Sequence, residues 1–196
     1  MKEKLAMFDM DGTLYDTVDS NYYAYKEAVE QFGFTLEHDF FEFVCYGHNY
    51  KDFVPMIVKE SLKGSDQDVV LTDEIVEKIH DAKLECYTKY FDKIRLNDGL
   101  INLIKRIKYN TYVALVTTGS SKNVHEILEY FHHEDLFDEV FTQDDVEKQK
   151  PDPECFVNAM KKFKMDPKDS FIYEDSDVGL RAAYKSGANV IKVGKF

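Results

Sequence analysis

The chain begins, after four residues, with the stretch Leu5-Ala6-Met7-Phe8-Asp9-Met10-Asp11-Gly12-Thr13. Its first four residues form a short apolar run, which predicts a buried strand, and Gly12 permits a sharp turn directly after it. Asp9 and Asp11 stand at this turn, where the alternation of an extended chain aims both side chains beyond the carboxyl end of the strand. Open α/β sheets bind their ligands at that end. Taken alone, such an acidic pair is also typical of a turn or a helix cap.

Four further apolar runs predict strands later in the chain, at 112–116, 139–141, 170–173 and 189–193. Between and before them lie amphipathic stretches of helical period, at 100–107, 124–131, 153–163 and 178–185. Strands that alternate with helices predict a parallel sheet with helices on both faces. We therefore expect an α/β core with a Rossmann-like, three-layer architecture.

The region between the first two predicted strands contains helical patterns only. Apolar residues recur at helical spacing in four stretches, near 22–32, 40–44, 53–58 and 75–87. A turn is predicted at 63–66, where glycine stands among polar residues. Such a block inserted into a sheet protein predicts a separate subdomain. We assign residues 15–95 to an all-helical cap and residues 1–14 and 96–196 to the α/β core.

Composition excludes several classes of protein. The 196 residues include 37 acidic and 25 basic side chains, which gives a net charge of −12. This charge repels phosphate backbones and anionic lipid, so we expect neither nucleic acid nor membrane as a partner. The three cysteines are far apart and form no CxxC pair, which argues against a disulfide framework or a zinc ribbon. Without a signal-peptide pattern or an apolar span of about 20 residues, we expect a cytoplasmic protein, as a monomer or weak dimer.

A second acidic group follows another predicted strand. Glu174, Asp175 and Asp177 provide three acids within four positions, an oxygen-rich arrangement that suits Mg²⁺. Ser176 or Asp177 is also suited to cap the helix that begins near Val178, and the two roles are compatible. Capping does not require Glu174 and Asp175, so we regard these two as candidate metal ligands.

Two more candidate groups stand near strand ends. Thr117 begins a run of small hydroxyl residues, 117–121, at a helix start, where backbone amides can cradle an anion. Residues of this kind before a helix often do no more than cap it. Lys150 lies in the segment 148–153, where two prolines fix the backbone. Most lysines are solvated surface residues, so this position alone is a weak signal.

Together these four pieces resemble the motifs of the haloacid dehalogenase (HAD) superfamily of phosphohydrolases. In chain order the motifs are Asp9-Met10-Asp11-Gly12-Thr13, Thr117, Lys150-Pro151-Asp152-Pro153 and Glu174-Asp175-Ser176-Asp177-Val178-Gly179. The last has the Glu-Asp-Ser-x-x-Gly form, similar to the β-phosphoglucomutase and phosphoglycolate phosphatase branch with a helical cap. The resemblance covers the predicted core and the placement of the cap, but not the details of the cap.

The resemblance implies a phosphatase that hydrolyses a small phosphorylated metabolite. Asp9 would be the nucleophile that forms an aspartyl-phosphate, and Asp11 the general acid and then the base for water. Thr117 and Lys150 would hold the phosphoryl oxygens. Thr118 and Gly119, which follow Thr117, are added as candidate substrate-binding residues.

The same resemblance implies Mg²⁺ as the cofactor. Asp9, the backbone carbonyl of Asp11 and the side chain of Asp175 would bind the ion, with Glu174 as a ligand directly or through water. A phosphate dianion cannot approach this many carboxylates unless Mg²⁺ and an ammonium group offset their charge. Without the metal, the site is expected to repel its substrate.

The cap is expected to supply substrate specificity. The stretch 46–51 resembles the specificity loop of such caps, and Lys51 or His48 is a candidate for binding a second polar group of the substrate. A solvated turn is an equally good interpretation of this stretch. The resemblance also implies a cap that opens and closes, with hinges near 15–16 and 95–96. The pair His132-His133 beside two acids is interpreted as a solvated helix end, not as a metal cluster.

Two departures from the family pattern bear on function. Gly179 stands where many relatives carry a second acid, so Glu174 is expected to take part of the metal binding. Asn21 stands where sugar-phosphate mutases of the family carry a histidine, which favours hydrolysis over phosphoryl return. The β-phosphoglucomutase type of mutase remains the first alternative, and dehalogenation is a weaker one. From a different class, a phospho-aspartate switch module shares the acids, hydroxyl and lysine, but an insertion of about 80 residues argues against it.

Overall fold

The computed structural model of the protein describes residues 2–64 and 70–196. The chain forms two compact units, one of Met1–Asp16 with Arg95–Phe196, the core unit, and one of Thr17–Ile94, the cap unit. Of the turn predicted at 63–66, residues 65 and 66 lie outside the described residues. Within the described part of the chain, no helix is both long and apolar enough to cross a membrane.

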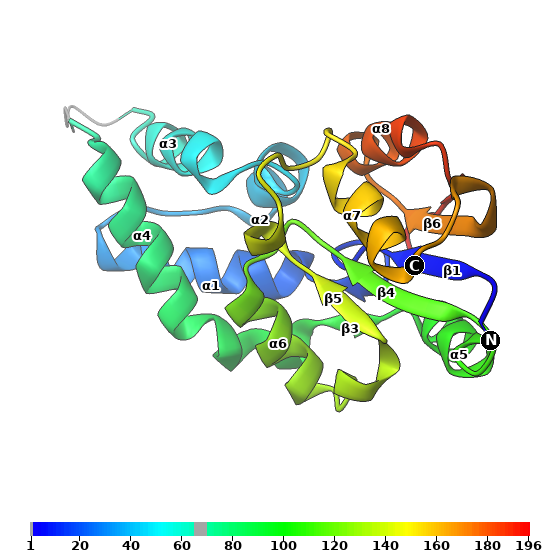
Figure 1. Cartoon of the computed structure of the whole chain (residues 1–196). Helices are drawn as coiled ribbons and strands as arrows, with labels where there is room; N and C mark the ends of the chain where they lie inside the picture. The colour runs from blue at the N-terminus through cyan, green and yellow to red at the C-terminus, as the bar shows by residue number, and fades with distance from the viewer. Residues whose placement is uncertain (1, 65–69) are drawn as a thin grey trace. The chain divides into compact units, whose positions relative to one another are not determined.

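The core unit is built on five parallel strands (Figure 1). The strands are β1 (Leu5–Phe8), β4 (Tyr112–Val116), β5 (Glu139–Phe141), β6 (Ser170–Glu174) and β7 (Asn189–Lys192). Their order across the sheet is β5-β4-β1-β6-β7, so β1 is central. All four residues of β1 are buried, as a strand covered on both faces requires. The predicted parallel α/β architecture is confirmed.

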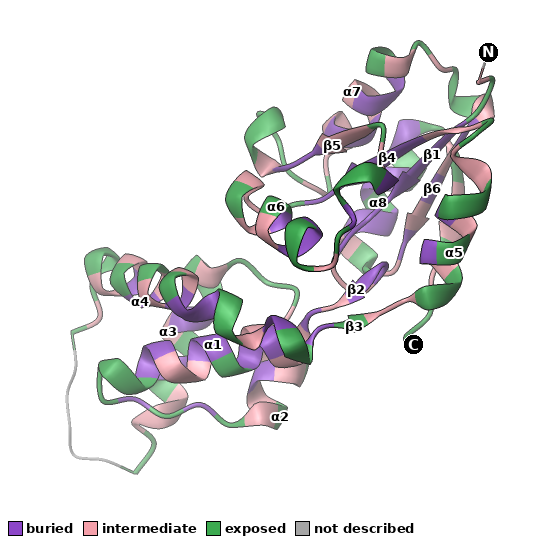
Figure 2. Cartoon of the chain, turned by 90° about the horizontal axis from the view of Figure 1, so that it is seen from below, coloured by how far each residue is buried: buried purple, intermediate pink, exposed green. Residues whose placement is uncertain are grey.

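Four helices flank this sheet, α5 (Asp98–Ile107), α6 (Ser121–Tyr130), α7 (Glu154–Phe163) and α8 (Asp177–Ser186). Leu5 and Met7 of β1 face α7 and α8 and pack with residues such as Phe156 and Ala183. The alternate strand residues are also buried, and α5 and α6 lie on that side of the sheet (Figure 1, Figure 2). Three layers result, and the carboxyl ends of the five strands meet at one edge.

A short antiparallel ribbon, which was not predicted, stands at the border of the core unit. It pairs β2 (Tyr15–Asp16) with β3 (Arg95–Leu96), with Tyr15 opposite Leu96 and Asp16 opposite Arg95. The guanidinium group of Arg95 forms an ion pair with the carboxylate of Asp16. The two chain segments that lead into and out of the cap unit are thereby joined to each other.

The cap unit is helical. It contains α1 (Val18–Gln31), α2 (His38–Phe40), a π-helix (Phe41–Cys45), α3 (Tyr50–Ser61), α4 (Asp73–Cys86) and a 3₁₀-helix (Tyr87–Lys93). The apolar faces of these helices share one core that includes Phe41, Phe53 and Ile79. The second predicted helix, at 40–44, differs from the structure, because α2 ends at Phe40 and continues as a π-helix. One-turn insertions of this kind have no distinct hydrophobic period, so the sequence pattern does not separate them from an α-helix.

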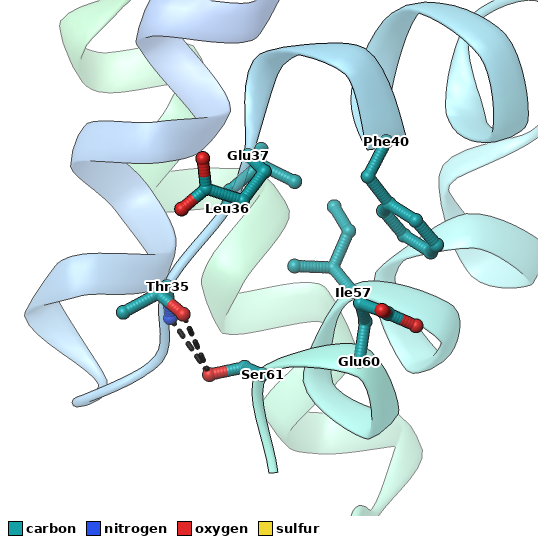
Figure 3. A pocket seen from close by; sticks show the side chains of 7 residues that line it. All are labelled: Thr35, Leu36, Glu37, Phe40, Ile57, Glu60 and Ser61. Carbon is teal, nitrogen blue, oxygen red and sulfur yellow. Dashed lines mark hydrogen bonds between the residues drawn. The ribbon is translucent and has the colours of Figure 1, made fainter. Parts of the chain in front are cut away.

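A small surface cavity of about 140 Å³ lies within the cap unit. Figure 3 shows its lining, which is formed by Thr35, Leu36, Glu37, Phe40, Ile57, Glu60 and Ser61. The hydroxyl oxygen of Ser61 accepts a hydrogen bond of 2.8 Å from the backbone N–H of Thr35 and closes one end. No residue predicted to carry chemistry lines this cavity.

Candidate active site

The ends of three neighbouring strands meet at the ammonium group of Lys150. Its Nζ atom lies 2.7 Å from Oδ1 of Asp9, which follows β1, and 2.7 Å from Oε2 of Glu174, at the end of β6. It also donates to the carbonyl of Val116, the last residue of β4, at 3.2 Å. One cation therefore joins the two acidic groups to the strand that leads into Thr117.

The loop before α7 holds Lys150 in this position. Glu154, the first residue of α7, accepts hydrogen bonds from the backbone N–H groups of Glu147 and Lys148 at 2.9 and 3.1 Å. Asp152 in turn accepts from the N–H of Glu154 at 3.0 Å. The loop is thus closed upon the start of the helix, and the side chain of Lys150 is only 4% exposed. Lys150, which was only a weak candidate in the sequence, thus forms a buried ion pair with Asp9 and Glu174.

The charged groups in this cluster shift one another's pKa values. Burial lowers the pKa of Lys150, but the carboxylates of Asp9 and Glu174 outweigh burial and raise it above its ordinary value, so the ammonium stays charged. Burial raises the pKa of Asp9; Lys150 opposes this shift, whereas Glu174 and Asp11 add to it. The region has an excess of negative charge that a divalent cation would offset.

Glu174 is fully buried and has hydrogen-bond partners on both carboxylate oxygens. Oε2 accepts from Lys150, while Oε1 accepts from the backbone N–H groups of Asp175 and Ser176 at 3.2 and 3.1 Å and from the Ser176 hydroxyl at 2.9 Å. The Ser176 oxygen caps α8 by accepting from the N–H of Gly179 at 3.0 Å, which confirms the predicted cap. Glu174 therefore organises the loop that carries Asp175.

Asp175 is held from the side of the first motif. The hydroxyl of Thr13, which is fully buried, donates to Oδ1 of Asp175 at 2.8 Å. Burial raises the pKa of Asp175; Thr13 lowers it, and Glu174 and Asp11 raise it further. Gly12, at a φ of +82°, makes room for this contact, because a Cβ at position 12 would lie 2.3 Å from Oδ2 of Asp175. The hydrogen bond from Thr13 to Asp175 was not predicted. The one sequence feature that pointed to Thr13 was its position in the first motif, two residues after Asp11.

Three of these side chains fit a magnesium ion. Asp9, Glu174 and Asp175 each offer a carboxylate oxygen, and the three oxygens lie within 4.8 Å of one another. Mg²⁺ prefers such oxygen ligands, at about 2.0–2.1 Å in an octahedron, so ligands on opposite sides of the ion lie about 4 Å apart. The donor set and its spacing are thus compatible with the ion after a small contraction. This is the one cluster of three or more potential metal-ligating side chains found in residues 2–64 and 70–196.

The phosphate-binding candidates surround the start of α6. Thr117 is buried directly after β4, and its hydroxyl oxygen accepts from the N–H of Gly119 at 3.0 Å. With its oxygen acting as an acceptor, the Thr117 hydroxyl still has one proton to donate. Ser120 caps α6 by accepting from the N–H of Asn123, and Thr118 is exposed. This arrangement matches the predicted combination of a hydroxyl group and a helix start.

The two predicted specificity residues, Lys51 and His48, both lie in the cap unit. Lys51 lies in the first turn of α3, where its ammonium group is 3.0 Å from the carboxylate of Glu77. His48 lies in the exposed turn before α3. Their proposed contact with substrate stays a prediction.

The prediction for His133 is wrong. His133 is buried, with 7% of its surface exposed, and its Nδ1 atom lies 2.8 Å from the hydroxyl of Tyr15. The backbone turns at His132, where φ is +55°, and this directs the next side chain inward. The predicted solvated helix end is therefore incorrect about the exposure of His133. The three cysteines are buried and unpaired.

The sequence profile of the haloacid dehalogenase-like hydrolase family matches residues 6–193. The chain belongs to this family. It is 25% identical over 182 residues to the phosphorylated carbohydrates phosphatase of Thermotoga maritima, covering 92% of this chain and 80% of that protein. Over 195 residues it is 26% identical to the β-phosphoglucomutase of Bacillus subtilis, covering 98% and 84%. The resemblance inferred from the four motifs is thereby confirmed.

A solved structure agrees with this assignment. CbbY from Rhodobacter sphaeroides, determined in complex with phosphate, superposes with a TM-score of 0.80 at 26% identity, over 100% of this chain and 88% of that one. Family membership and the phosphatases among the relatives support a phosphoric monoester hydrolase.

Proposed function

We propose that this HAD-family protein is a Mg²⁺-dependent phosphatase that hydrolyses a small phosphomonoester, in particular a sugar phosphate, through an aspartyl-phosphate on Asp9. The observation that carries the proposal is the buried contact of Lys150 with both Asp9 and Glu174, beside a cluster of carboxylates with the donor set of a magnesium site. Relatives named for phosphorylated carbohydrates and fructose 1-phosphate support the substrate class.

Asp9 is the nucleophile in this proposal. A carboxylate oxygen of Asp9 attacks phosphorus, and the bond from phosphorus to the ester oxygen breaks. Asp11 gives its proton to the departing oxygen and then, as a carboxylate, takes a proton from the water that attacks the acyl phosphate. The water adds to phosphorus, inorganic phosphate leaves, and Asp9 is restored.

The remaining residues bind the phosphoryl group. Lys150 holds Asp9 in place and presents its positive charge to the phosphoryl oxygens, because its pKa keeps it protonated. The Thr117 hydroxyl donates to a second oxygen, and the amides after it, with Thr118 and Gly119, receive the anion at the start of α6. The buried surroundings strengthen each of these interactions relative to water.

Asp9, Asp175 and the backbone carbonyl of Asp11 would hold Mg²⁺, with Glu174 acting through a water molecule. The assignment of Glu174 rests on its four hydrogen bonds, which already engage both of its oxygens. When bound, the ion offsets the negative charge of the carboxylates and of the phosphoryl group. Asp175 is fixed for this task by the hydroxyl of Thr13.

The cap unit is proposed to select the substrate. Lys51 and His48 are the residues assigned to the part of the metabolite beyond the phosphoryl group, and the ion pair with Glu77 orients Lys51. Lys51→Ala is expected to raise KM for the preferred sugar phosphate while leaving kcat for p-nitrophenyl phosphate unchanged.

The net negative charge of the chain favours an enzyme that binds neither nucleic acid nor membrane. We propose that it is cytoplasmic and acts as a monomer or weak dimer.

A sugar-phosphate mutase is the second candidate, because β-phosphoglucomutase is a relative along 98% of this chain. Asn21, which donates to the Thr17 carbonyl and to the Tyr87 hydroxyl, stands where such mutases are expected to carry histidine. Its side-chain amide cannot serve as a proton carrier. This difference favours hydrolysis.

The proposed function is tested with p-nitrophenyl phosphate and a panel of sugar phosphates, in Mg²⁺ and in EDTA, using the wild type and Asp9→Asn. We expect phosphate release that requires both the metal and Asp9. Isomerised sugar phosphate without free phosphate would favour the mutase. Unchanged hydrolysis by Asp9→Asn would overturn the proposal.

A further inference from the structure

We propose that Tyr15 and His133 are positioning residues that hold the turn carrying Asp11 in its catalytic geometry. The inference rests on the proposed function, because it concerns the proton that Asp11 supplies. Neither side chain belongs to the four motifs, and both lie in the core unit.

The two side chains form a buried polar pair beside the sheet. Tyr15 is fully buried, and its hydroxyl lies 2.8 Å from Nδ1 of His133. The tyrosine ring also packs against Phe131 and His133, with centroids 5.8 and 5.9 Å apart. A buried tyrosine hydroxyl needs a hydrogen-bond partner, and apolar residues would fill the same space without that requirement. The pair therefore fixes the Tyr15 side chain in one orientation.

The backbone of Tyr15 is part of the turn that contains Asp11. The carbonyl of Tyr15 accepts from the N–H of Gly12 at 2.8 Å, and the N–H of Tyr15 donates to the carbonyl of Met10 at 3.0 Å. These bonds bracket Asp11, which also forms a β-bridge with Tyr15. A shift of Tyr15 would move Gly12 and Met10, and hence the residue between them. The side chain of Tyr15 thus anchors the main chain on which Asp11 depends.

Asn97, which follows β3 and caps α5, fixes the same turn. Its backbone N–H donates to the carbonyl of Leu14 at 2.9 Å, and its side-chain amide donates to the carbonyl of Thr13 at 3.0 Å. These bonds secure the middle of the turn and leave Tyr15 to secure its end. The hydrogen bond between Tyr15 and His133 joins this end to the region after α6.

The surroundings of His133 keep its imidazole neutral. Burial lowers its pKa, Lys105 of α5 and His132 lower it further, and Glu134 opposes them. Tyr15, which faces the ring from β2, contributes a neutral hydroxyl. A neutral imidazole with its proton on Nε2 offers Nδ1 as the acceptor for the Tyr15 hydroxyl. The anchor is therefore in place at neutral pH, where a phosphatase of this kind would work.

Loss of the Tyr15–His133 hydrogen bond should affect substrates unequally, whereas a general loss of stability should affect them equally. A poorly placed Asp11 hinders release of a leaving group that needs a proton and has little effect on one that leaves as a stable anion. Phenyl phosphate and p-nitrophenyl phosphate share the phenyl ester and differ by one nitro group, which removes this requirement for a proton. The value of kcat/KM includes the steps up to aspartyl-phosphate formation, so the ratio of the two values reports on proton donation.

The test compares Tyr15→Phe with the wild type on both esters in Mg²⁺. We expect kcat/KM to fall about tenfold for phenyl phosphate and less than about threefold for p-nitrophenyl phosphate. His133→Phe is expected to give the same change, and His133→Asn, which keeps a polar atom near the position of Nδ1, to restore much of the ratio. Tyr109→Phe, at a tyrosine that is 85% exposed, is the matched control and should change neither value.

The outcomes separate this inference from the proposed function. Equal losses on the two esters in Tyr15→Phe and His133→Phe, or no loss at all, would overturn the positioning role while leaving the phosphatase intact. Thermal unfolding of each variant identifies a loss caused by misfolding, and the His133→Asn comparison then decides the matter on a conservative change. Absence of hydrolysis of either ester by the wild type would overturn the proposed function and this inference with it.

Discussion

The carboxylate of Glu174 occupies the space in which a side chain at Gly179 would stand. A Cβ at position 179 would lie 2.0 Å from the carboxylate carbon, closer than real Cβ atoms approach their neighbours. A side chain at position 179 is therefore sterically excluded in this protein. Glu174 uses the space to reach Lys150, Ser176 and the backbone before α8.

Gly179→Ala is expected to displace Glu174 and to impair both folding and activity. Overpacking of a buried site costs about 1–3 kcal/mol, and loss of the Glu174 contacts releases Lys150 from one of its partners. We expect kcat for p-nitrophenyl phosphate to fall at least about tenfold, since the metal site and Lys150 both shift. Gly194→Ala is the control, because nothing lies within 4 Å of a Cβ there. Equal behaviour of the two variants would contradict the steric account.

Lys150→Met is expected to destabilise the protein in the absence of metal. The change leaves Asp9 and Glu174 buried without their shared cation, and removing one partner of a buried ion pair costs about 3–5 kcal/mol. Urea unfolding in EDTA measures this loss. Adding Asp9→Asn should recover part of it, because one of the two carboxylate charges is then absent. A Lys150→Met variant as stable as the wild type would show that the pair contributes little.

Magnesium is expected to stabilise the folded protein. An ion that binds only the folded state adds about 3 kcal/mol at a free concentration of about 100 times its Kd. Increasing Mg²⁺ should therefore raise the Tm of the wild type, as measured by differential scanning fluorimetry. Asp175→Asn should weaken the effect, whereas Asp177→Asn, which changes a carboxylate outside the three-residue cluster, should retain it. Identical Mg²⁺ responses of the two variants would place the ion elsewhere.

The stability of the cap unit is expected to depend on pH through His80. Its Nδ1 atom lies 2.8 Å from the Tyr25 hydroxyl, and its ring stacks on Tyr50 at 3.7 Å. Burial, aided by Lys83, lowers the pKa of His80 to about 4. Between pH 6.5 and 4 the unfolded chain thus binds more protons than the folded one at this position. The stability is complete above pH 6.5 and falls as the pH is lowered toward 4.

The pKa difference at His80 corresponds to at most about 3 kcal/mol, and partial exposure of the ring reduces the expected loss to about 1–2 kcal/mol. Urea unfolding at pH 7 and pH 4.5 measures it. His80→Phe should show a smaller drop between the two pH values than the wild type, whereas Tyr25→Phe, which keeps the imidazole, should retain the drop. An unchanged pH dependence in His80→Phe would contradict this assignment.

The sheet could be predicted because each strand is a short apolar run. The strand β1, for example, is buried along its whole length, so four apolar residues in a row define it. The ribbon of β2 and β3 could not be predicted, since two residues are too few to show an alternating pattern. The ribbon pairs Tyr15 with Leu96, and the whole cap unit separates these two residues in the sequence.

The sequence predicts the site residues from their positions at strand ends, but it does not predict which residues they contact. The contact of Lys150 with Glu174 depends on register, because Phe8 stands opposite Tyr173 and the next residues, Asp9 and Glu174, are therefore neighbours. His133 shows the same limit. A solvated helix end was predicted because adjacent residues there point apart. The burial of His133 instead involves Tyr15, which lies 118 residues earlier in the chain.

The central claim, that Asp9 carries the phosphoryl group, is tested most directly on the Asp11→Asn variant. This variant should accept a phosphoryl group from p-nitrophenyl phosphate, whose leaving group needs no proton, and then release it slowly for lack of a general base. The measurement is peptide mapping by mass spectrometry after an acid quench, with Mg²⁺ present. We predict one phosphoryl group on Asp9 and none when Asp9→Asn is added. A phosphoryl group on another residue, or none at all while the wild type turns over, would contradict the account.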